Sequence, residues 1–162
     1  MQVEFTVSGK PIAKGRPRFT RNGHAYTDEK TAAYETLVRL SYQQQAGQKL
    51  QGELIASIEA FFPILKSTSK KSAEEMREGE VGPTKKPDAD NIAKAVLDAL
   101  NGVAYDDDAQ VTTLLVKKCY SDEPRVKVQI FEKKGTDEDL YQILINTILR
   151  GISREWRAYG SD

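Results

Sequence analysis

The chain has 162 residues, of which 39% are hydrophobic and 30% charged, proportions typical of one globular domain rather than a disordered chain. Its 24 basic and 24 acidic residues give a formal net charge of +0, so net charge alone gives no argument for nucleic-acid binding. Cys119 is the only cysteine, which excludes an intrachain disulfide and fits a reducing cytosol. The N-terminus lacks a signal-peptide pattern and every apolar run is short, so we expect a cytoplasmic protein with no membrane partner.

The first third of the chain predicts a strand, a loop and a helix. Residues 2–8 alternate apolar and polar side chains, the pattern of a half-buried strand. Residues 9–27 are rich in glycine, proline and basic residues and predict a loop or an irregular hairpin. A helix is expected from about Asp28, with Gly47 just beyond its end. Three residues share its predicted apolar face, with Tyr34 and Val38 beside them: Ala33, Leu37 and Leu40.

The remaining patterns complete an α+β fold, a single small domain whose mixed sheet packs against helices. Residues 66–86 are polar and predict a mobile loop or a short exposed helix. No internal repeat or linker to a second domain is visible. The strands predicted from alternating or apolar runs are 54–62, 110–120 and 125–132, the last two antiparallel, and the predicted helices are 91–100 and 137–156.

Two acidic motifs carry the strongest chemical signal. Residues 86–94 read KPDADNIAK, and residues 106–111 read DDDAQV. A near-extended backbone would point Asp88 and Asp90 to the same side. Carboxylates collected from separate elements repel one another unless a cation lies between them, and hard oxygen ligands suit Mg²⁺, Mn²⁺ or Ca²⁺. The sequence therefore predicts a divalent-metal site.

Each acidic motif also has a simpler interpretation. Asp88 or Asp90 could be the N-cap of the helix that follows, because acids are favoured at helix N-termini. Three consecutive aspartates are commonly a solvated turn. Lys94 could form an ordinary surface ion pair one helical turn after Asp90, or it could stabilise charge on a metal-bound phosphate.

Basic residues gather in separate segments. Residues 9–21 carry five positive charges and no negative one, and their arginines suit bidentate phosphate contacts, although a solubilising loop would read the same way. Basic segments that flank an acidic metal site are what a nuclease needs, because they neutralise the phosphates of its substrate. The candidate DNA-binding residues are Lys14, Arg16, Arg18, Arg21, Lys85, Lys86, Lys117 and Lys118.

The two acidic motifs, in this order and spacing, resemble the RusA family of Holliday-junction resolvases, which are phage- and prophage-associated endonucleases. The Gly15-Arg16-Pro17-Arg18 loop followed by Ala25-Tyr26-Thr27 is also similar to phage members, and the resemblance covers roughly residues 1–133. It implies a small mixed α/β fold and a homodimer that makes paired nicks in four-way junction DNA. The expected cofactor is Mg²⁺, with Mn²⁺ as a substitute. The expected setting is recombination and repair in the cytoplasm of a bacterium or a phage-infected host.

The resemblance also assigns roles to individual residues. The family's essential carboxylates match Asp88, Asp90 and Asp108, and its functional lysine matches Lys94. Asp107 falls beside the third carboxylate and is a further candidate metal ligand. We expect a nuclease domain over 1–134 and a helical extension over 135–162, packed on the same domain or on a dimer partner. The rival functions are a catalytically silent module that binds branched DNA and a metal-dependent nuclease for another branched DNA.

Overall fold

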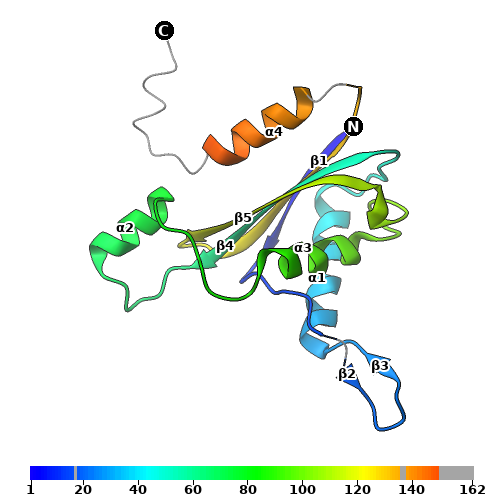
Figure 1. Cartoon of the computed structure of the whole chain (residues 1–162), viewed down its shortest axis with the longest axis horizontal. Coiled ribbons are helices and arrows are strands. Elements are labelled where there is room, and N and C mark those ends of the chain that lie inside the picture. Colours follow the sequence, from blue (N-terminus) through cyan, green and yellow to red (C-terminus); the bar gives the residue numbers. More distant parts are fainter. Residues whose placement is uncertain (17, 136–137, 150–162) are drawn as a thin grey trace.

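The computed structural model describes the whole chain except residues 17, 136–137 and 150–162 (Figure 1). A four-stranded sheet carries helices on both of its faces, and a separate two-stranded sheet forms a hairpin, which confirms the predicted α+β class. Each predicted strand and helix has a counterpart. In chain order the elements are β1 (Gln2–Ser8), β2 (Arg18–Phe19), β3 (Ala25–Tyr26), α1 (Glu29–Gln45), β4 (Leu54–Pro63), α2 (Lys70–Glu78), α3 (Ala89–Leu100), the 3₁₀ turn η1 (Asp108–Gln110), β5 (Val111–Ser121), β6 (Arg125–Glu132) and α4 (Glu138–Leu149).

The main sheet has the strand order β1-β6-β4-β5. Strand β6 pairs antiparallel with β1 and β4, whereas β4 and β5 are parallel. The segments 110–120 and 125–132 therefore do not pair with each other, because β4 lies between them. Nearly every residue of β4 is buried, on both sides of the sheet, which suits a central strand.

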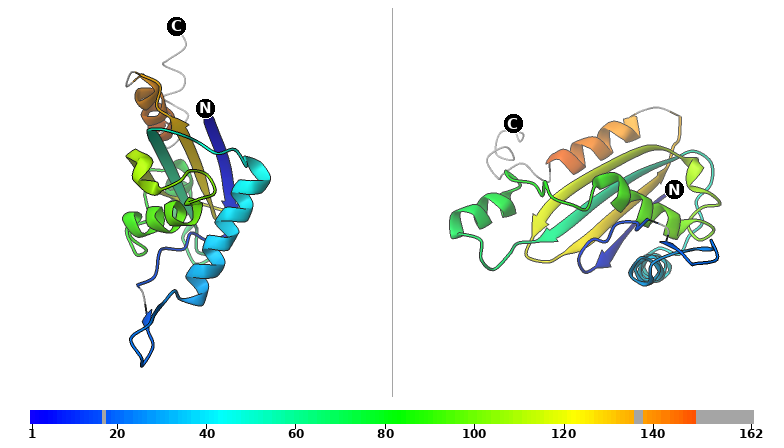
Figure 2. Two further views of the ribbon diagram at one scale, coloured as in Figure 1. Left: turned by 90° about the vertical axis from the view of Figure 1, so that its right-hand side faces the viewer. Right: turned by 60° about the horizontal axis from the view of Figure 1, so that its bottom comes forward.

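Helices α1 and α3 cover one face of the sheet and enclose the main core (Figures 1 and 2). The ring of Phe5 on β1 meets that of Tyr42 on α1 edge to face, with centroids 5.3 Å apart. Ile92 and Val96 on the buried side of α3 are fully buried. The amphipathic pattern that predicted α3 therefore fixes the rotation of this helix about its own axis.

The predicted apolar face of α1 is wrong. Leu37 and Leu40 are 41% and 49% exposed, whereas Tyr34, Val38 and Tyr42 are buried. The buried residues are spaced four apart and form one stripe along the helix. Two tyrosine rings remove more apolar area from water than an alanine and two leucines do, so packing selects the tyrosine stripe.

Helix α4 lies across the opposite face of the sheet, and Ile143 is buried beneath it (Figure 2). Residues 150–156 of the helix predicted over 137–156 lie outside the described residues. Helix α2 lies within the polar segment 66–86, capped by Ser69, whose hydroxyl accepts a hydrogen bond from the Ser72 amide. Within the described ranges, none of the helices combines the length and the apolar character that a bilayer crossing requires.

Candidate functional site

The first acidic motif begins helix α3. Asp88 is the N-cap residue, with extended backbone angles of φ −72° and ψ 148°, and Asp90 lies in the first helical turn. The near-extended backbone expected for this motif ends at Asp88, because the helix already begins at Ala89. Both carboxylates lie at the N-terminal end of the helix, where acidic side chains stabilise the helix dipole. The Asp88 side chain makes no capping hydrogen bond, so its oxygens are not committed to the helix.

Lys94 is exposed one turn further along α3. In the part of the chain that the structure describes, the (i, i+4) ion pair is formed by Lys71 and Glu75 on α2 rather than by Asp90 and Lys94. The simple helix-surface ion pair is therefore not the arrangement seen at this position. The ammonium group of Lys94 remains available to a ligand that approaches the acidic end of the helix.

The second acidic motif is built around a short 3₁₀ turn. Asp107 caps this turn, since its Oδ1 atom accepts a hydrogen bond from the Ala109 amide at 2.8 Å. Gln110 completes a capping box by accepting from the Asp107 amide at 3.2 Å, and its own amide group donates to the Gly52 carbonyl at 3.0 Å. Asp106 is exposed and pairs with Lys49. Asp107 thus has a structural role. If its carboxylate also binds a metal ion, it must do so while it caps the turn.

Asp108 lies beside the C-terminal half of α3. Burial raises the pKa of Asp108, and the negative charges of Asp98 and Asp107 raise it further. The loop that leads from α3 to η1 is fixed by Tyr105, whose buried hydroxyl donates to the Leu97 carbonyl at 2.8 Å. Burial also raises the pKa of this phenol, with added effects from Asp108 and Asp98. Asp98, which the sequence reasoning did not single out, is therefore a close neighbour of Asp108.

The predicted ligands are divided between the two ends of α3. Asp90 and Asp98 are eight residues apart, about 12 Å along the helix axis. Among the described residues, no group of three histidine, cysteine, aspartate or glutamate side chains is close enough together to hold a metal ion. Hard carboxylate donors fit Mg²⁺ chemically. In a single chain the described side chains do not already form a three-ligand site for the ion.

Lys14, a predicted DNA-binding residue, forms ion pairs within the protein instead. Its Nζ atom lies 3.0 Å from Asp98 Oδ2 and also pairs with Glu35 on α1. Its side chain is only 23% exposed. The sequence did not reveal this arrangement because its three members come from distant parts of the chain. Lys14 therefore connects the N-terminal loop to α1 and α3 rather than offering its charge to a phosphate.

The other predicted basic residues have different surroundings. Arg16 and Arg21 are exposed, and the side chain of Arg18 lies outside the described residues. Lys118 is a structural contact, since it donates to the Lys85 carbonyl at 2.7 Å and holds the segment before α3 against β5. Lys85 and Lys86 themselves are exposed just before the first acidic motif.

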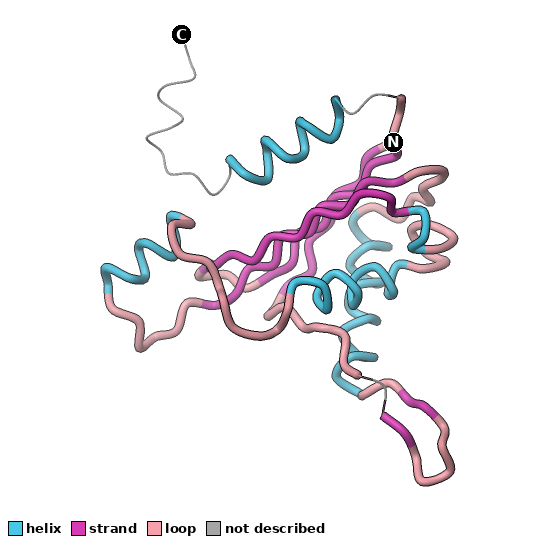
Figure 3. Tube along the Cα trace, in the orientation of Figure 1, coloured by secondary structure: helices cyan, strands magenta, loops and turns pink. Residues whose placement is uncertain are grey.

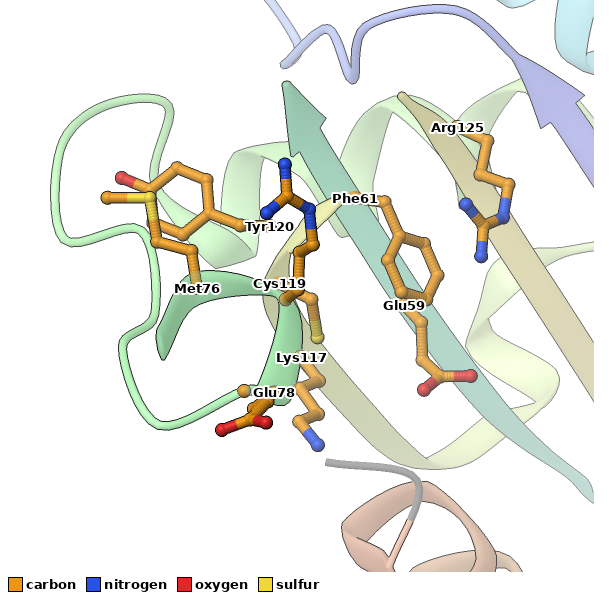
Figure 4. Close-up of a pocket in the computed structure, with 10 residues that line it drawn as sticks. Glu59, Phe61, Met76, Glu78, Lys117, Cys119, Tyr120 and Arg125 are labelled. Atoms are coloured by element: carbon orange, nitrogen blue, oxygen red, sulfur yellow. The ribbon is translucent and has the colours of Figure 1, made fainter. Parts of the chain in front are cut away.

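Lys117 lines a pocket on the other face of the sheet, away from α3 (Figure 4). The pocket has a volume of about 220 Å³ and lies between α2 and strands β4 to β6. Its wall includes Arg125, whose guanidinium group is 4.0 Å from the centre of the Phe61 ring. Burial raises the pKa of the nearby Cys119 thiol. The alternation of β4 separates this pocket from the acidic motifs, so Lys117 does not share a surface with them.

Comparisons with known proteins identify the class of this chain. The profile of the RusA endodeoxyribonuclease family matches residues 8–131, which spans both acidic motifs, the basic loop and strands β4 to β6. The chain therefore belongs to the RusA endodeoxyribonuclease family, as its motifs predicted. A protein of Bacillus subtilis (strain 168), described as uncharacterized protein YqaN, is 42% identical over 136 residues. That match covers 80% of this chain and 96% of the Bacillus protein.

Proposed function

We propose that this protein is a Mg²⁺-dependent endodeoxyribonuclease that resolves Holliday junctions by paired symmetric nicks, in DNA recombination and repair. Membership of the RusA family supports a nuclease role. One observation carries the proposal furthest. The backbone amide of Lys14 donates a hydrogen bond to the Asn91 carbonyl at 2.9 Å, so the base of the basic loop lies against the acidic first turn of α3. A surface that attracts phosphates thereby adjoins the carboxylates that would hold a cation.

The proposed roles follow from exposure and position. Asp88 and Asp90 are exposed at the start of α3 and would hold the metal ion together with Asp108. When bound, Mg²⁺ activates water and offsets charge on a phosphate. The exposed ammonium group of Lys94 would stabilise negative charge on the phosphate that is cut. Asp107 would act chiefly by capping η1 and so placing Asp108.

A homodimer is part of the proposal. A four-way junction has approximate two-fold symmetry, and two symmetric cuts need one site for each of two strands, which a two-fold dimer provides. Mg²⁺ usually keeps several waters and is held by one or two carboxylates with substrate phosphates, so water and the DNA can supply the ligands that this chain does not.

The test is cleavage of a labelled mobile four-way junction, with linear duplex of the same sequence as control. Reactions contain Mg²⁺, Mn²⁺ or EDTA. Wild type should make paired symmetric nicks that need the metal. Asp90→Asn should lower the cleavage rate by at least about 100-fold while junction affinity is kept or increased, because the substitution removes a metal ligand and a charge that repels phosphates. Glu138→Gln, which removes an exposed carboxylate at the start of α4, should leave cleavage unchanged.

The rival function is a branched-DNA-binding module without turnover, and the intact set of acidic residues argues against it. Tight junction binding with no nicks in any divalent metal would establish that rival. Loss of junction binding in a folded Asp90→Asn protein would contradict the role given to Asp90. Equal cutting of junction and duplex would retain the nuclease but remove its junction specificity.

A further inference from the structure

Strands β2 and β3 form a hairpin that projects away from the body of the domain (Figures 1 and 3). Its turn is closed by the Thr20 amide, which donates to the His24 carbonyl at 2.9 Å, and by the Gly23 amide, which donates to the Thr20 carbonyl at 3.0 Å. Gly23 has a φ of 78°, a conformation that glycine adopts without a steric penalty. The turn is thus locally well hydrogen-bonded although it lies away from the core.

The base of this hairpin is fixed to both helices of the main core. Lys14 bonds to α3 through its amide and through its ammonium group, and the same ammonium group pairs with Glu35 on α1. The Gly15 amide donates to the Thr31 hydroxyl at 3.3 Å. A Cβ atom at position 15 would lie 3.0 Å from that hydroxyl oxygen, so any larger residue would require the Thr31 side chain to shift. The direction of the hairpin is therefore set by the same helix that carries Asp88 and Asp90.

The exposed surface of the hairpin combines positive charge with one aromatic ring. Arg16 and Arg21 are exposed, and residues 9–27 contain no acid. Phe19 is 68% exposed. A single exposed apolar side chain is ordinary on a protein surface, and Leu65 is exposed to the same extent. What distinguishes Phe19 is its position among cations on a projecting hairpin whose base adjoins the acidic motif.

We propose that the β2–β3 hairpin is a DNA-binding arm that stacks Phe19 on a base at the branch point of a junction, while Arg16 and Arg21 contact the flanking phosphates. This inference rests on the proposed function. Aromatic rings stack on bases whose faces are accessible, and apolar side chains inserted at a base step unstack it. Bases at a branch point have lost a stacking neighbour, whereas those inside a duplex have not.

The dimensions of the arm agree with this use. The three residues from Arg18 to the turn at Thr20 span roughly 10 Å when extended, at about 3.3 Å per residue. The major groove of duplex DNA is about 8.5 Å deep. An arm anchored beside a strand's phosphates can therefore reach the base stack.

The experiment places the fluorescent base 2-aminopurine at the branch point of a four-way junction, or within one arm as a position control. Wild type, Phe19→Ala and the equally exposed control Leu65→Ala are compared in EDTA, so that no cleavage occurs. Because stacking quenches 2-aminopurine, wild type and Leu65→Ala should lower the fluorescence at the branch point and not within the arm. Phe19→Ala should lose this decrease and bind the junction about tenfold more weakly, with duplex binding unchanged.

Arg21→Gln separates charge from stacking. It should weaken junction and duplex binding alike, and it should lower the slope of log affinity against log salt by about one. A branch-point signal that Phe19→Ala retains overturns the stacking role, even if the protein cuts junctions as proposed. A Phe19-dependent signal from a protein that nicks no DNA supports the arm and removes the nuclease function.

Discussion

The two ends of helix α3 hold their acidic residues in opposite ways. At the N-terminal end, Asp88 and Asp90 are exposed, and Asp88 makes no capping hydrogen bond. At the C-terminal end, Asp98 pairs with Lys14, Asp107 caps a 3₁₀ turn, and Asp108 is half-buried. One end is open to an incoming ligand, and the other is tied into the fold.

This difference separates two requirements of a metal-dependent nuclease. Exposed carboxylates can accept a cation with little rearrangement, but their own positions are weakly defined. Carboxylates held by capping bonds and ion pairs are precisely placed, yet part of their hydrogen-bonding capacity is already used. We call the C-terminal end of α3 the fixed end and its N-terminal end the open end. We infer that the fixed end sets the position of Asp108 and that the open end supplies adaptable ligands.

The largest effect on stability should come from Tyr105, which supports the fixed end. Tyr105→Ala removes a fully buried ring and should lower the free energy of unfolding by about 3–5 kcal/mol. Tyr105→Phe keeps the ring but removes the hydrogen bond to the Leu97 carbonyl, at a cost of about 1 kcal/mol. Urea denaturation of each variant measures both values.

The matched variant at the open end is Asp88→Asn. Its expected effect on the free energy of unfolding is below about 0.5 kcal/mol, because the side chain caps nothing. If Asp88→Asn destabilised the protein more than Tyr105→Phe, the contrast between the two ends of α3 would be wrong.

The fold was largely visible in the sequence where its signals are local. The alternation of Val3, Phe5 and Val7 predicted β1, and the apolar stripe before Asn101-Gly102 predicted α3 and its end. Two features were not visible. Helix α1 carries two competing apolar stripes, and only packing against β1 selects one of them. The position of β4 between β5 and β6 depends on pairing between distant segments, which leaves no local pattern.

The candidate site also has some features that were visible in the sequence and others that were not. The acidic motifs and the basic loop were apparent from residue type and spacing. The pairing of Lys14 with Glu35 and Asp98 was not, because it joins three segments that only the tertiary structure brings together. Charge counted along the sequence therefore overstated the number of cations that the loop offers to DNA.

Asp107 tests whether the fixed end is structural or metal-binding. Asp107→Ala removes the cap of η1 and should cost about 1 kcal/mol of unfolding free energy, whereas Asp107→Asn keeps a good cap and should cost little. The same order should appear in the Mg²⁺ dependence of cleavage, with Asp107→Asn close to wild type. An equal loss of Mg²⁺ affinity in both variants would instead show that the carboxylate itself binds the ion.

The smallest effect concerns Asp108 and depends on pH. Burial, with the charges of Asp98 and Asp107, raises the pKa of Asp108 in the folded protein. A raised carboxyl pKa means that the folded state holds the proton more tightly, so stability falls as pH rises from the unfolded value of about 3.9 through the folded pKa. Asp108→Asn removes this cost and should raise Tm by about 1–2 °C at pH 7, without metal.

The gain should disappear near pH 3, where Asp108 is protonated in both states and resembles the asparagine. Thermal unfolding at the two pH values measures the difference, and Asp106→Asn, at an exposed carboxylate of the same motif, is the control. A lower Tm of Asp108→Asn at pH 7 would mean that the ionised carboxylate makes a favourable contact in the fold. Asp108 would then belong wholly to the fixed end, and it would not be available to bind a cation.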